Sequence, residues 1–132
     1  QRINKILSNK IKNKKIAFLG VTFKPNTDDM RQSSSLYMIP FLLKKGAIIN
    51  YYDPSGEKRE FSKYKNVSFC KNIKEVCKNV DLVIIHTEWE EFKAIDFKKL
   101  TKRKNFKIYD MRNLYSSENM KKKRFKYYSI GR

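Results

Sequence analysis

Short apolar runs recur along the chain, and the segments between them carry apolar residues at helical spacing. Each run is bounded by polar, charged or turn-forming residues, a pattern typical of strands that are buried in a sheet. The strands expected from these runs are Lys15–Leu19, Ala47–Tyr52, Val67–Phe69, Leu82–Ile85, Phe106–Tyr109 and Tyr127–Ile130.

The segments between the runs predict helices. Ser33–Ser35 offer N-terminal caps for a first helix that ends at Gly46, and Asn72 offers a cap for the next one. Pro40 falls inside the first helix, so we expect this helix either to bend there or to begin later than the serines. Further helices are expected around Ile73–Cys77, around Phe97–Leu100 and over Ser117–Arg124.

Strands that alternate with helices predict parallel β-α-β units with right-handed crossovers and helices on both faces of the sheet. We therefore expect an α/β fold: a Rossmann-like three-layer domain with a mainly parallel sheet. The 132 residues suffice for one such domain and its core. Residues 1–13 precede this domain, and their apolar residues Ile3, Ile6, Leu7 and Ile11 lie near helical spacing. This pattern is typical of the end of a longer helix that packs on something outside itself.

The charge balance is strongly basic, with 31 Lys and Arg against 13 Asp and Glu and a net charge of +18. Such a charge attracts polyanions, acidic lipids or phosphorylated ligands, although lysines that are spread over solvated faces give the same sum. No recognisable DNA- or RNA-reading motif accompanies the charge. We expect no specific nucleic-acid partner, and a basic nucleic-acid-binding module remains the alternative from a different class of function.

Cysteine content and hydropathy restrict the setting. Cys70, Cys77 and His86 have neither the number nor the spacing of a zinc site or a disulfide framework, so we expect no metal and reduced thiols. No apolar run has the length of a membrane span, and the first residues lack the apolar core of a signal peptide. These features favour a cytoplasmic protein that does not contact a membrane.

Polar clusters follow three of the expected strands, at Gly20–Arg31, Thr87–Trp89 and Asp110–Asn113. The carboxyl ends of parallel strands meet at one edge of a sheet, where open α/β sheets bind ligands. Lys24 and Arg112 would place a point charge and a planar guanidinium there, and both suit phosphate; Arg31, near a helix start, would add a third cation. The alternative is that Asp28, Asp29 and Asp110 neutralise these cations in ordinary loop ion pairs.

A dinucleotide-binding motif is not supported. Gly20 is followed by Val21 rather than by further glycines, and Asp53 lies farther along than the usual ribose-binding acid, so it is expected to form a turn before Pro54. No nucleophile or acid pair stands out as a catalytic constellation. Trp89 and Phe92 are expected to pack in the core or an interface, and His86 to be a packed or exposed histidine without ligands.

Several ordered motifs carry a family resemblance. They are IAFLGVTFKPNTDDMRQSSS from Ile16 to Ser35, YYDP from Tyr51, HTEWEEF from His86, DMRN from Asp110 and the terminal YYSIGR. Together they closely resemble the C-terminal, UDP-binding domain of the UDP-glucose/GDP-mannose dehydrogenase family, over nearly the whole chain from Lys15 to Arg132. The resemblance implies that residues 1–14 end a connecting helical region and that residues 15–132 form the UDP-binding domain.

The resemblance also implies an activity for the complete enzyme. Members oxidise the C6 alcohol of a nucleotide sugar to a carboxylate in two NAD-dependent steps, here UDP-glucose, with GDP-mannose or a UDP-N-acetylhexosamine as the alternative substrate. An N-terminal domain binds most of the NAD, a central helical region forms the homodimer, and the C-terminal domain closes over the UDP. The nucleophilic cysteine lies outside this chain, so we expect no catalytic residue here and no activity of these residues alone.

Site residues follow from the matching positions. Phe23 and Lys24 match the family's FK pair at the nucleotide-sugar site, and Arg112 matches an arginine that reaches the UDP, in many members across the dimer. Arg31 matches the arginine of the TDDxR segment, which approaches the NAD pyrophosphate. The chain departs from the pattern at Met111, where many members have glycine, and at Gln32, where many have an acid, but neither change alters the proposed phosphate ligands.

Overall fold

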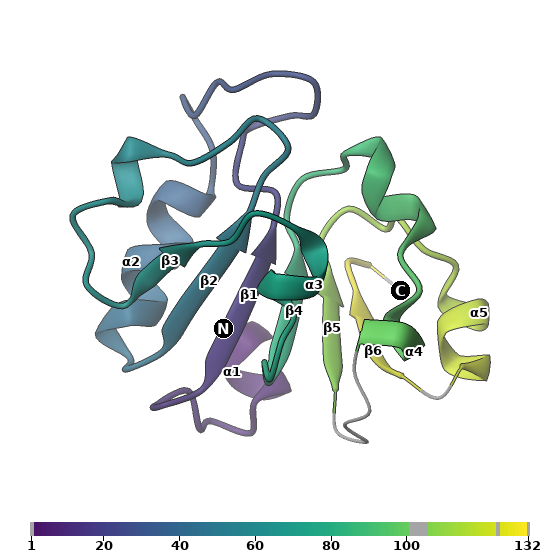
Figure 1. The fold of residues 1–132 in the computed structure, drawn as a ribbon. Helices are drawn as coiled ribbons and strands as arrows, with labels where there is room; N and C mark the ends of the chain where they lie inside the picture. Colours follow the sequence, from purple (N-terminus) through teal and green to yellow (C-terminus); the bar gives the residue numbers. More distant parts are fainter. Residues whose placement is uncertain (1, 101–105, 124, 132) are drawn as a thin grey trace.

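A single parallel sheet organises the structure, a computed structural model that describes residues 2–100, 106–123 and 125–131 (Figure 1). The strand order is β3-β2-β1-β4-β5-β6, and all pairs are parallel. The order reverses between β1 and β4, as in a Rossmann fold, so the predicted fold class is confirmed. The strands are β1 (Lys15–Leu19), β2 (Ile48–Tyr52), β3 (Val67–Phe69), β4 (Leu82–Ile85), β5 (Lys107–Asp110) and β6 (Lys126–Ser129).

Helices cover both faces of this sheet, with α1 and α2 behind it and α3 and α4 in front of it in Figure 1. None of the helices within the described residues is long and apolar enough to span a membrane. Arg124 and Arg132, the ends of the predicted last helix and of the predicted domain, lie outside the described residues. The helices are α1 (Arg2–Ile6), α2 (Ser35–Lys44), α3 (Ile73–Val76), α4 (Phe97–Leu100) and α5 (Ser117–Lys122), with short 3-10 helices η1 (Arg59–Phe61) and η2 (Glu90–Ala94).

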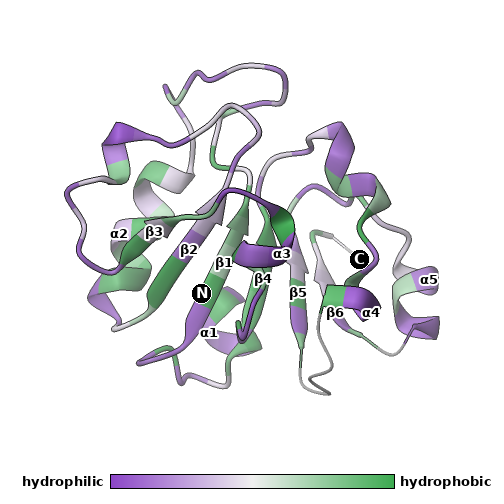
Figure 2. Cartoon of the chain, viewed as in Figure 1, coloured by the Kyte–Doolittle hydropathy of each residue, from purple (hydrophilic) through white to green (hydrophobic). Residues whose placement is uncertain are grey.

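Two hydrophobic cores result from the alternation of side chains along each strand. On one face, Phe18 of β1 and Ile84 of β4 pack with α1 and α2; on the other, Leu19 and Ile85 pack with α3, η2, α4 and α5. Every residue of β4 is buried, and this strand is apolar along its length in Figure 2. Burial on both faces therefore explains why the apolar runs predicted the strands so closely.

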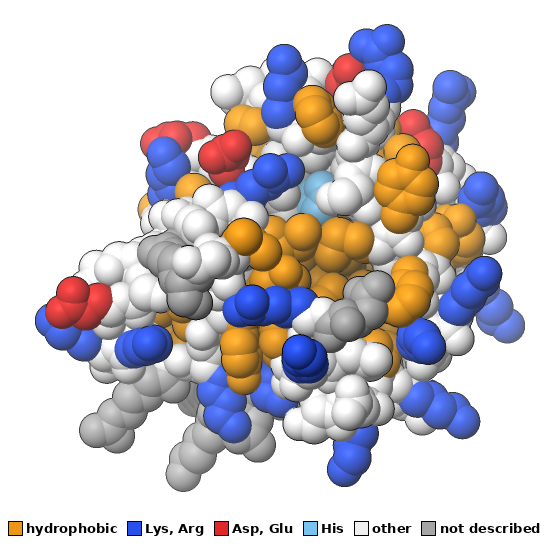
Figure 3. All heavy atoms as spheres, turned by 180° about the vertical axis from the view of Figure 1, so that it is seen from behind, with side chains coloured by type: hydrophobic (Ala, Val, Ile, Leu, Met, Phe, Trp, Pro, Cys, Tyr) orange, Lys and Arg blue, Asp and Glu red, His pale blue; other side chains and the backbone are white. Residues whose placement is uncertain are grey.

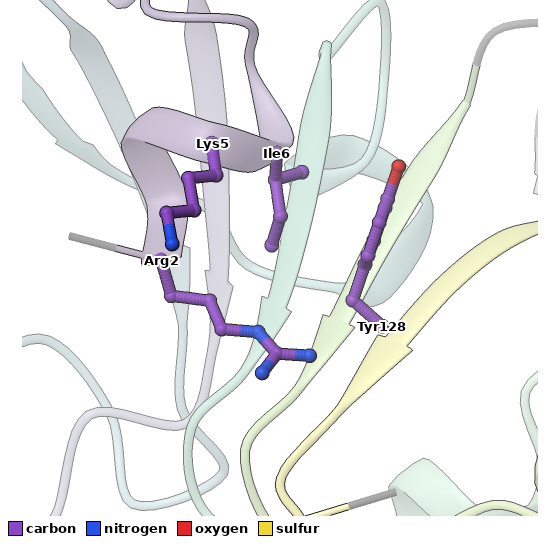
Figure 4. A pocket seen from close by; sticks show the side chains of 4 residues that line it. All are labelled: Arg2, Lys5, Ile6 and Tyr128. Atoms are coloured by element: carbon purple, nitrogen blue, oxygen red, sulfur yellow. The ribbon is translucent and has the colours of Figure 1, made fainter.

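The N-terminal segment packs on the domain's own sheet. Its apolar residues at positions 3, 6, 7 and 11 are all buried in the first core. Arg2 donates from Nη2 to the carbonyl oxygen of Ser129 at 2.8 Å, and Lys107 donates to the carbonyl oxygen of Ile6 at 2.9 Å. Between α1 and β6, Arg2, Lys5, Ile6 and Tyr128 line a pocket (Figure 4), and the apolar surface on this side of the molecule is rimmed by Lys and Arg (Figure 3). This segment completes one face of the sheet.

The first helix differs from its prediction. α2 begins at Ser35, the last of the three serines, so a later start is wrong, and Pro40 lies well inside the helix. Pro40 has no N–H and leaves the carbonyl of Leu36 without its helical donor. Elsewhere, the cap at Asn72 is confirmed, because its side chain accepts from the Glu75 N–H at 2.7 Å. The other predicted strand boundaries are within one residue of those observed.

A close backbone approach joins β1 and β4 where the sheet order reverses. Gly20, directly after β1, has φ = +79°, a conformation that favours glycine. A Cβ at this position would lie 2.5 Å from Cβ of Thr87, which follows β4. Gly20 is therefore required both for its backbone conformation and for the space that the side chain of Thr87 occupies.

This contact predicts that Gly20→Ala destabilises the domain far more than Gly56→Ala. Gly56 also has a positive φ, +102°, but a Cβ added there would meet no described atom within 4 Å beyond its chain neighbours. Gly56→Ala should therefore cost about 1–2 kcal/mol for the backbone conformation, and Gly20→Ala at least about 1–3 kcal/mol more for the overlap with Thr87. Urea unfolding of both variants measures the difference, and equal losses of stability would contradict the steric argument.

Candidate functional site

The candidate site lies at the carboxyl edge of the central strands. Leu19 pairs with Ile85, and Ile85 pairs with Asp110, so the last residues of β1, β4 and β5 lie in one row. The loops that leave these strands carry the polar clusters that the sequence singled out. The structure thus brings the three clusters to one edge, as expected.

Asp53, at the end of β2, holds the loop after β1. Its side chain is 1% exposed, and Oδ2 accepts hydrogen bonds from the backbone N–H groups of Val21 at 2.8 Å and Thr22 at 3.3 Å. Oδ1 accepts from the N–H and hydroxyl of Ser55, at 2.9 and 2.6 Å. The predicted turn is confirmed, but the reach to the first loop was missed, because it depends on β2 lying beside β1.

Two serines fix the same loop from the start of α2. The hydroxyls of Ser33 and Ser35 both donate to the carbonyl oxygen of Val21, at 2.5 and 2.6 Å. Ser34 occupies the N-cap position but makes no side-chain capping bond. The serines therefore mark the helix start, and Oγ of Ser33 accepts there from the Ser35 N–H at 3.3 Å. The Ser34 hydroxyl is instead 2.9 Å from Nε2 of His86.

A pair of threonines links the loops after β1 and β4. Thr22 donates from Oγ1 to the carbonyl oxygen of Lys24 at 2.9 Å. Thr87 donates from Oγ1 to the carbonyl oxygen of Thr22, also at 2.9 Å. Both threonines are fully buried. Their hydroxyls satisfy two backbone carbonyls and tie the segment that carries Lys24 to the end of β4.

His86 is a packed histidine, 1% exposed, between α2 and the loop after β4. Nδ1 lies 3.1 Å from Oγ1 of Thr87, whose one hydroxyl proton goes to Thr22. Nδ1 must therefore carry the proton, which leaves Nε2 to accept from the hydroxyl of Ser34. Burial, followed by the charge of Arg112, lowers the pKa of His86 to about 4, against a hydrogen bond to the Gly20 backbone that acts in the opposite direction. The ring is neutral at pH 7.

Arg112 lies on the loop after β5 and is held at two points. Its Nε donates to the carbonyl oxygen of His86 at 2.8 Å, and its backbone N–H donates to Oδ1 of Asp110 at 3.1 Å. Asp110 is fully buried, and its Oδ2 also accepts from the Tyr115 N–H and the Tyr127 hydroxyl. Within the described residues, the two terminal nitrogens of the guanidinium form no hydrogen bond or ion pair, so they are available to a ligand.

Lys24 and Phe23 are presented by the loop after β1. Phe23 is 45% exposed, and its N–H donates to the carbonyl oxygen of Asp29 at 3.2 Å, which closes the loop. Lys24 is exposed, and its ammonium group forms no hydrogen bond or ion pair with any described residue. The ammonium group of Lys24 thus remains unneutralised while its backbone is held by Thr22.

Arg31, by contrast, is paired. Its guanidinium forms a bidentate contact with the carboxylate of Asp29, with both N–O distances at 3.0 Å. These hydrogen bonds to Arg31 lower the pKa of Asp29 to about 2. The side chain of Arg31 is 89% exposed, so the pair is a solvated loop ion pair. The alternative that nearby aspartates neutralise these cations in loop ion pairs therefore holds for Arg31, but not for Lys24 or Arg112.

At this edge, the place where an ordinary Rossmann domain binds a dinucleotide is not suited to one. The carboxylate of Asp53, which would bind ribose in an ordinary Rossmann domain, is buried against Val21 and Thr22. The first N–H groups of α2 are satisfied internally: Ser35 donates to Oγ of Ser33, and the next two residues to the carbonyls of Ser33 and Ser34. The amides that would cradle a pyrophosphate are therefore occupied.

The surroundings of the remaining candidate residues, two cysteines and two aromatic residues, indicate structural roles. Burial raises the pKa of Cys70 to about 11 and that of Cys77 to about 12, which disfavours the reactive thiolate. Among the described residues, no group of three or more His, Cys, Asp and Glu could hold a metal ion. Phe92 is fully buried, and Trp89 packs against the same core, which confirms the packing prediction.

Comparison with known proteins places these features in a family. The pattern of the UDP-binding domain of the UDP-glucose/GDP-mannose dehydrogenase family matches residues 17–117. The chain is 36% identical to UDP-glucose 6-dehydrogenase of Rickettsia felis over 98% of its length, and 39% identical to that of Rhizobium meliloti over 92%. It spans only 30% and 28% of these relatives.

Solved structures agree with this match. NDP-N-acetyl-D-galactosaminuronic acid dehydrogenase from Methanosarcina mazei superposes with a TM-score of 0.82 and 28% identity, over 99% of this chain and 27% of the other. A UDP-glucose dehydrogenase from Pyrobaculum islandicum superposes with a TM-score of 0.77 and 25% identity, over 98% and 27%. The chain belongs to the UDP-glucose/GDP-mannose dehydrogenase family and corresponds to its UDP-binding domain.

Proposed function

We propose that this chain is the UDP-binding part of a UDP-glucose 6-dehydrogenase and that Lys24 and Arg112 bind the pyrophosphate of UDP-glucose. The observation that carries the proposal is a pair of cations, on two loops at one edge of the sheet, whose terminal donors no described residue has taken. Lysine offers a compact charge and arginine a planar fork, which together suit the oxygens of a diphosphate.

Three of the acids near these cations are already engaged, which supports an external anion as the partner of Lys24 and Arg112. Asp28, on the loop that carries Lys24, is exposed and forms no ion pair with a described residue. Asp29 binds Arg31, Asp53 binds backbone and Ser55, and Asp110 binds backbone and a tyrosine hydroxyl. An anionic ligand would meet two positive side chains whose local charge these acids do not cancel. Phe23, exposed next to Lys24, is assigned to the same nucleotide-sugar site.

We assign most of the NAD binding, and the oxidation steps, to parts of the protein outside this chain. The dinucleotide position within this domain is filled by its own side chains, and Arg31, on the exposed surface, is the residue assigned to the NAD pyrophosphate. The complete protein is proposed to act as a cytoplasmic homodimer. Binding energy at the UDP end orients the reacting sugar, so a domain without catalytic residues still contributes to turnover.

Lys24→Ala in the complete protein should raise the KM for UDP-glucose and the Kd for UDP by about tenfold, because one charge-assisted phosphate contact is lost. Lys121→Ala is the matched control, since it removes the same charge from the exposed face of α5. Calorimetric titration with UDP and steady-state kinetics give the two constants. Unchanged values for Lys24→Ala would exclude this residue from the site.

Arg112→Lys should weaken UDP binding nearly as much as Arg112→Ala, again by about tenfold. Lysine keeps the charge, but it cannot donate to the His86 carbonyl and present a planar fork to phosphate at the same time. Arg59→Lys, an exposed position in η1, controls for the same substitution elsewhere. Full binding by Arg112→Lys would show that only charge is needed at this position.

The net charge of +18 favours one competing function, binding to nucleic acid. Our proposal predicts saturable UDP binding at physiological salt that an excess of single- or double-stranded oligonucleotide does not displace. Displacement by the oligonucleotide, or salt-sensitive oligonucleotide binding without any response to UDP, would favour the nucleic-acid-binding module instead. Turnover of UDP-glucose, GDP-mannose and a UDP-N-acetylhexosamine by the complete protein distinguishes the sugar alternatives.

A further inference from the structure

Hydrogen bonds and short covalent segments of Thr22 and His86 together connect the backbone of Lys24 with the guanidinium of Arg112. Thr22 donates to the Lys24 carbonyl, and Thr87 donates to the Thr22 carbonyl, each at 2.9 Å. The ring of His86 contacts the same hydroxyl of Thr87 at 3.1 Å, and the carbonyl of His86 accepts from Arg112 at 2.8 Å. The two proposed phosphate ligands, on loops more than 80 residues apart in sequence, are therefore joined through Thr87.

Thr87 makes both contacts with one hydroxyl group. Its hydroxyl has one proton, which goes to Thr22, and its lone pairs accept from Nδ1–H of His86. Its Cβ fills the space that a side chain at position 20 would need, so the side chain is wedged against Gly20. Because Thr87 is 0% exposed, water does not replace either hydrogen bond.

Holding both loops before the ligand arrives matters for affinity. Long cationic side chains on separate loops lose conformational freedom when they bind one diphosphate, and that loss subtracts from the binding free energy. If the loops are already in register, only the side-chain ends have to be ordered. A hydroxyl that merely satisfies the Thr22 carbonyl would affect stability but would not discriminate between ligands with and without phosphate.

We propose that Thr87 is a positioning residue that holds Lys24 and Arg112 in register for the pyrophosphate of the nucleotide. This inference rests on the proposed function, because it takes these two cations as the phosphate ligands. It adds a residue that does not touch the ligand and acts through the backbone of Thr22 and the ring of His86.

The test compares Thr87→Val with Thr87→Ser in the complete protein. Valine keeps the packing volume against Gly20 but loses the hydroxyl, whereas serine keeps the hydroxyl. The probes are UDP and uridine, each titrated calorimetrically. We expect Thr87→Val to raise the Kd for UDP about fivefold or more and to leave the Kd for uridine unchanged. We expect Thr87→Ser to bind UDP with a Kd near the wild-type value.

Tyr51→Phe is the matched control for the loss of a buried hydroxyl. The Tyr51 hydroxyl accepts from the Lys58 N–H at 2.8 Å and belongs to a separate hydrogen-bonded set. This variant should lose stability in urea unfolding but bind UDP as the wild type does. If Thr87→Val does not fold, Thr22→Val takes its place, since it removes only the bond to the Lys24 carbonyl and should show the same UDP-specific loss.

The outcomes separate this inference from the proposed function. Wild-type protein that does not bind UDP, or Lys24→Ala and Arg112→Ala variants that bind it normally, would overturn the proposed function and the inference with it. Normal UDP binding by folded Thr87→Val, or by Thr22→Val where that variant decides, would overturn the inference alone. Equal weakening for UDP and uridine would also overturn it, because it would indicate a general loss of structure.

Discussion

The conformation of the loop after β1 depends on the hydrogen bonds that the buried carboxylate of Asp53 accepts. A charge that is 1% exposed must be compensated by hydrogen bonds, and the donors nearest to it are the N–H groups of Val21 and Thr22. Their engagement fixes the backbone that leads to Phe23 and Lys24. An acid at the end of β2 would bind ribose in an ordinary dinucleotide domain, so the same carboxylate that fixes this loop is removed from the cofactor role.

The rest of the edge follows from this constraint. With the loop held from β2, the hydroxyls of Ser33 and Ser35 satisfy the carbonyl of Val21, and Thr87 satisfies that of Thr22. The position next to β1 where a pyrophosphate would approach the backbone is thereby filled with protein hydrogen bonds. What remains for a ligand lies farther out, at the ends of Lys24 and Arg112, so the edge presents side-chain cations rather than main-chain N–H groups.

Sequence reasoning succeeded where a local pattern carries the structural information. Continuous apolar runs predicted β1 and β4 to the residue, because burial on both faces leaves no polar position in β4 and none in β1 after its exposed first residue. It failed where partners are distant in sequence. Nothing near Asp53 indicates a bond to Val21, 32 residues away, and the preference of Ser34 for His86 over a cap depends on β4 lying beside β1. Pro40 misled because the packing of α2 on the sheet outweighs one missing hydrogen bond.

Local pairing, rather than net charge, distinguishes the cations at the edge. Because the chain has a net charge of +18, the number of lysines does not indicate which cationic side chains bind phosphate. Arg31 and Arg112 are both arginines that follow a strand and lie close to an aspartate in sequence, but Asp29 binds the guanidinium of Arg31, whereas Asp110 binds the backbone N–H of Arg112. A ligand that approaches Arg31 must compete with a bidentate carboxylate. A ligand that approaches Arg112 meets donors that no described acid has taken, and the carbonyl of His86 already holds the guanidinium in place.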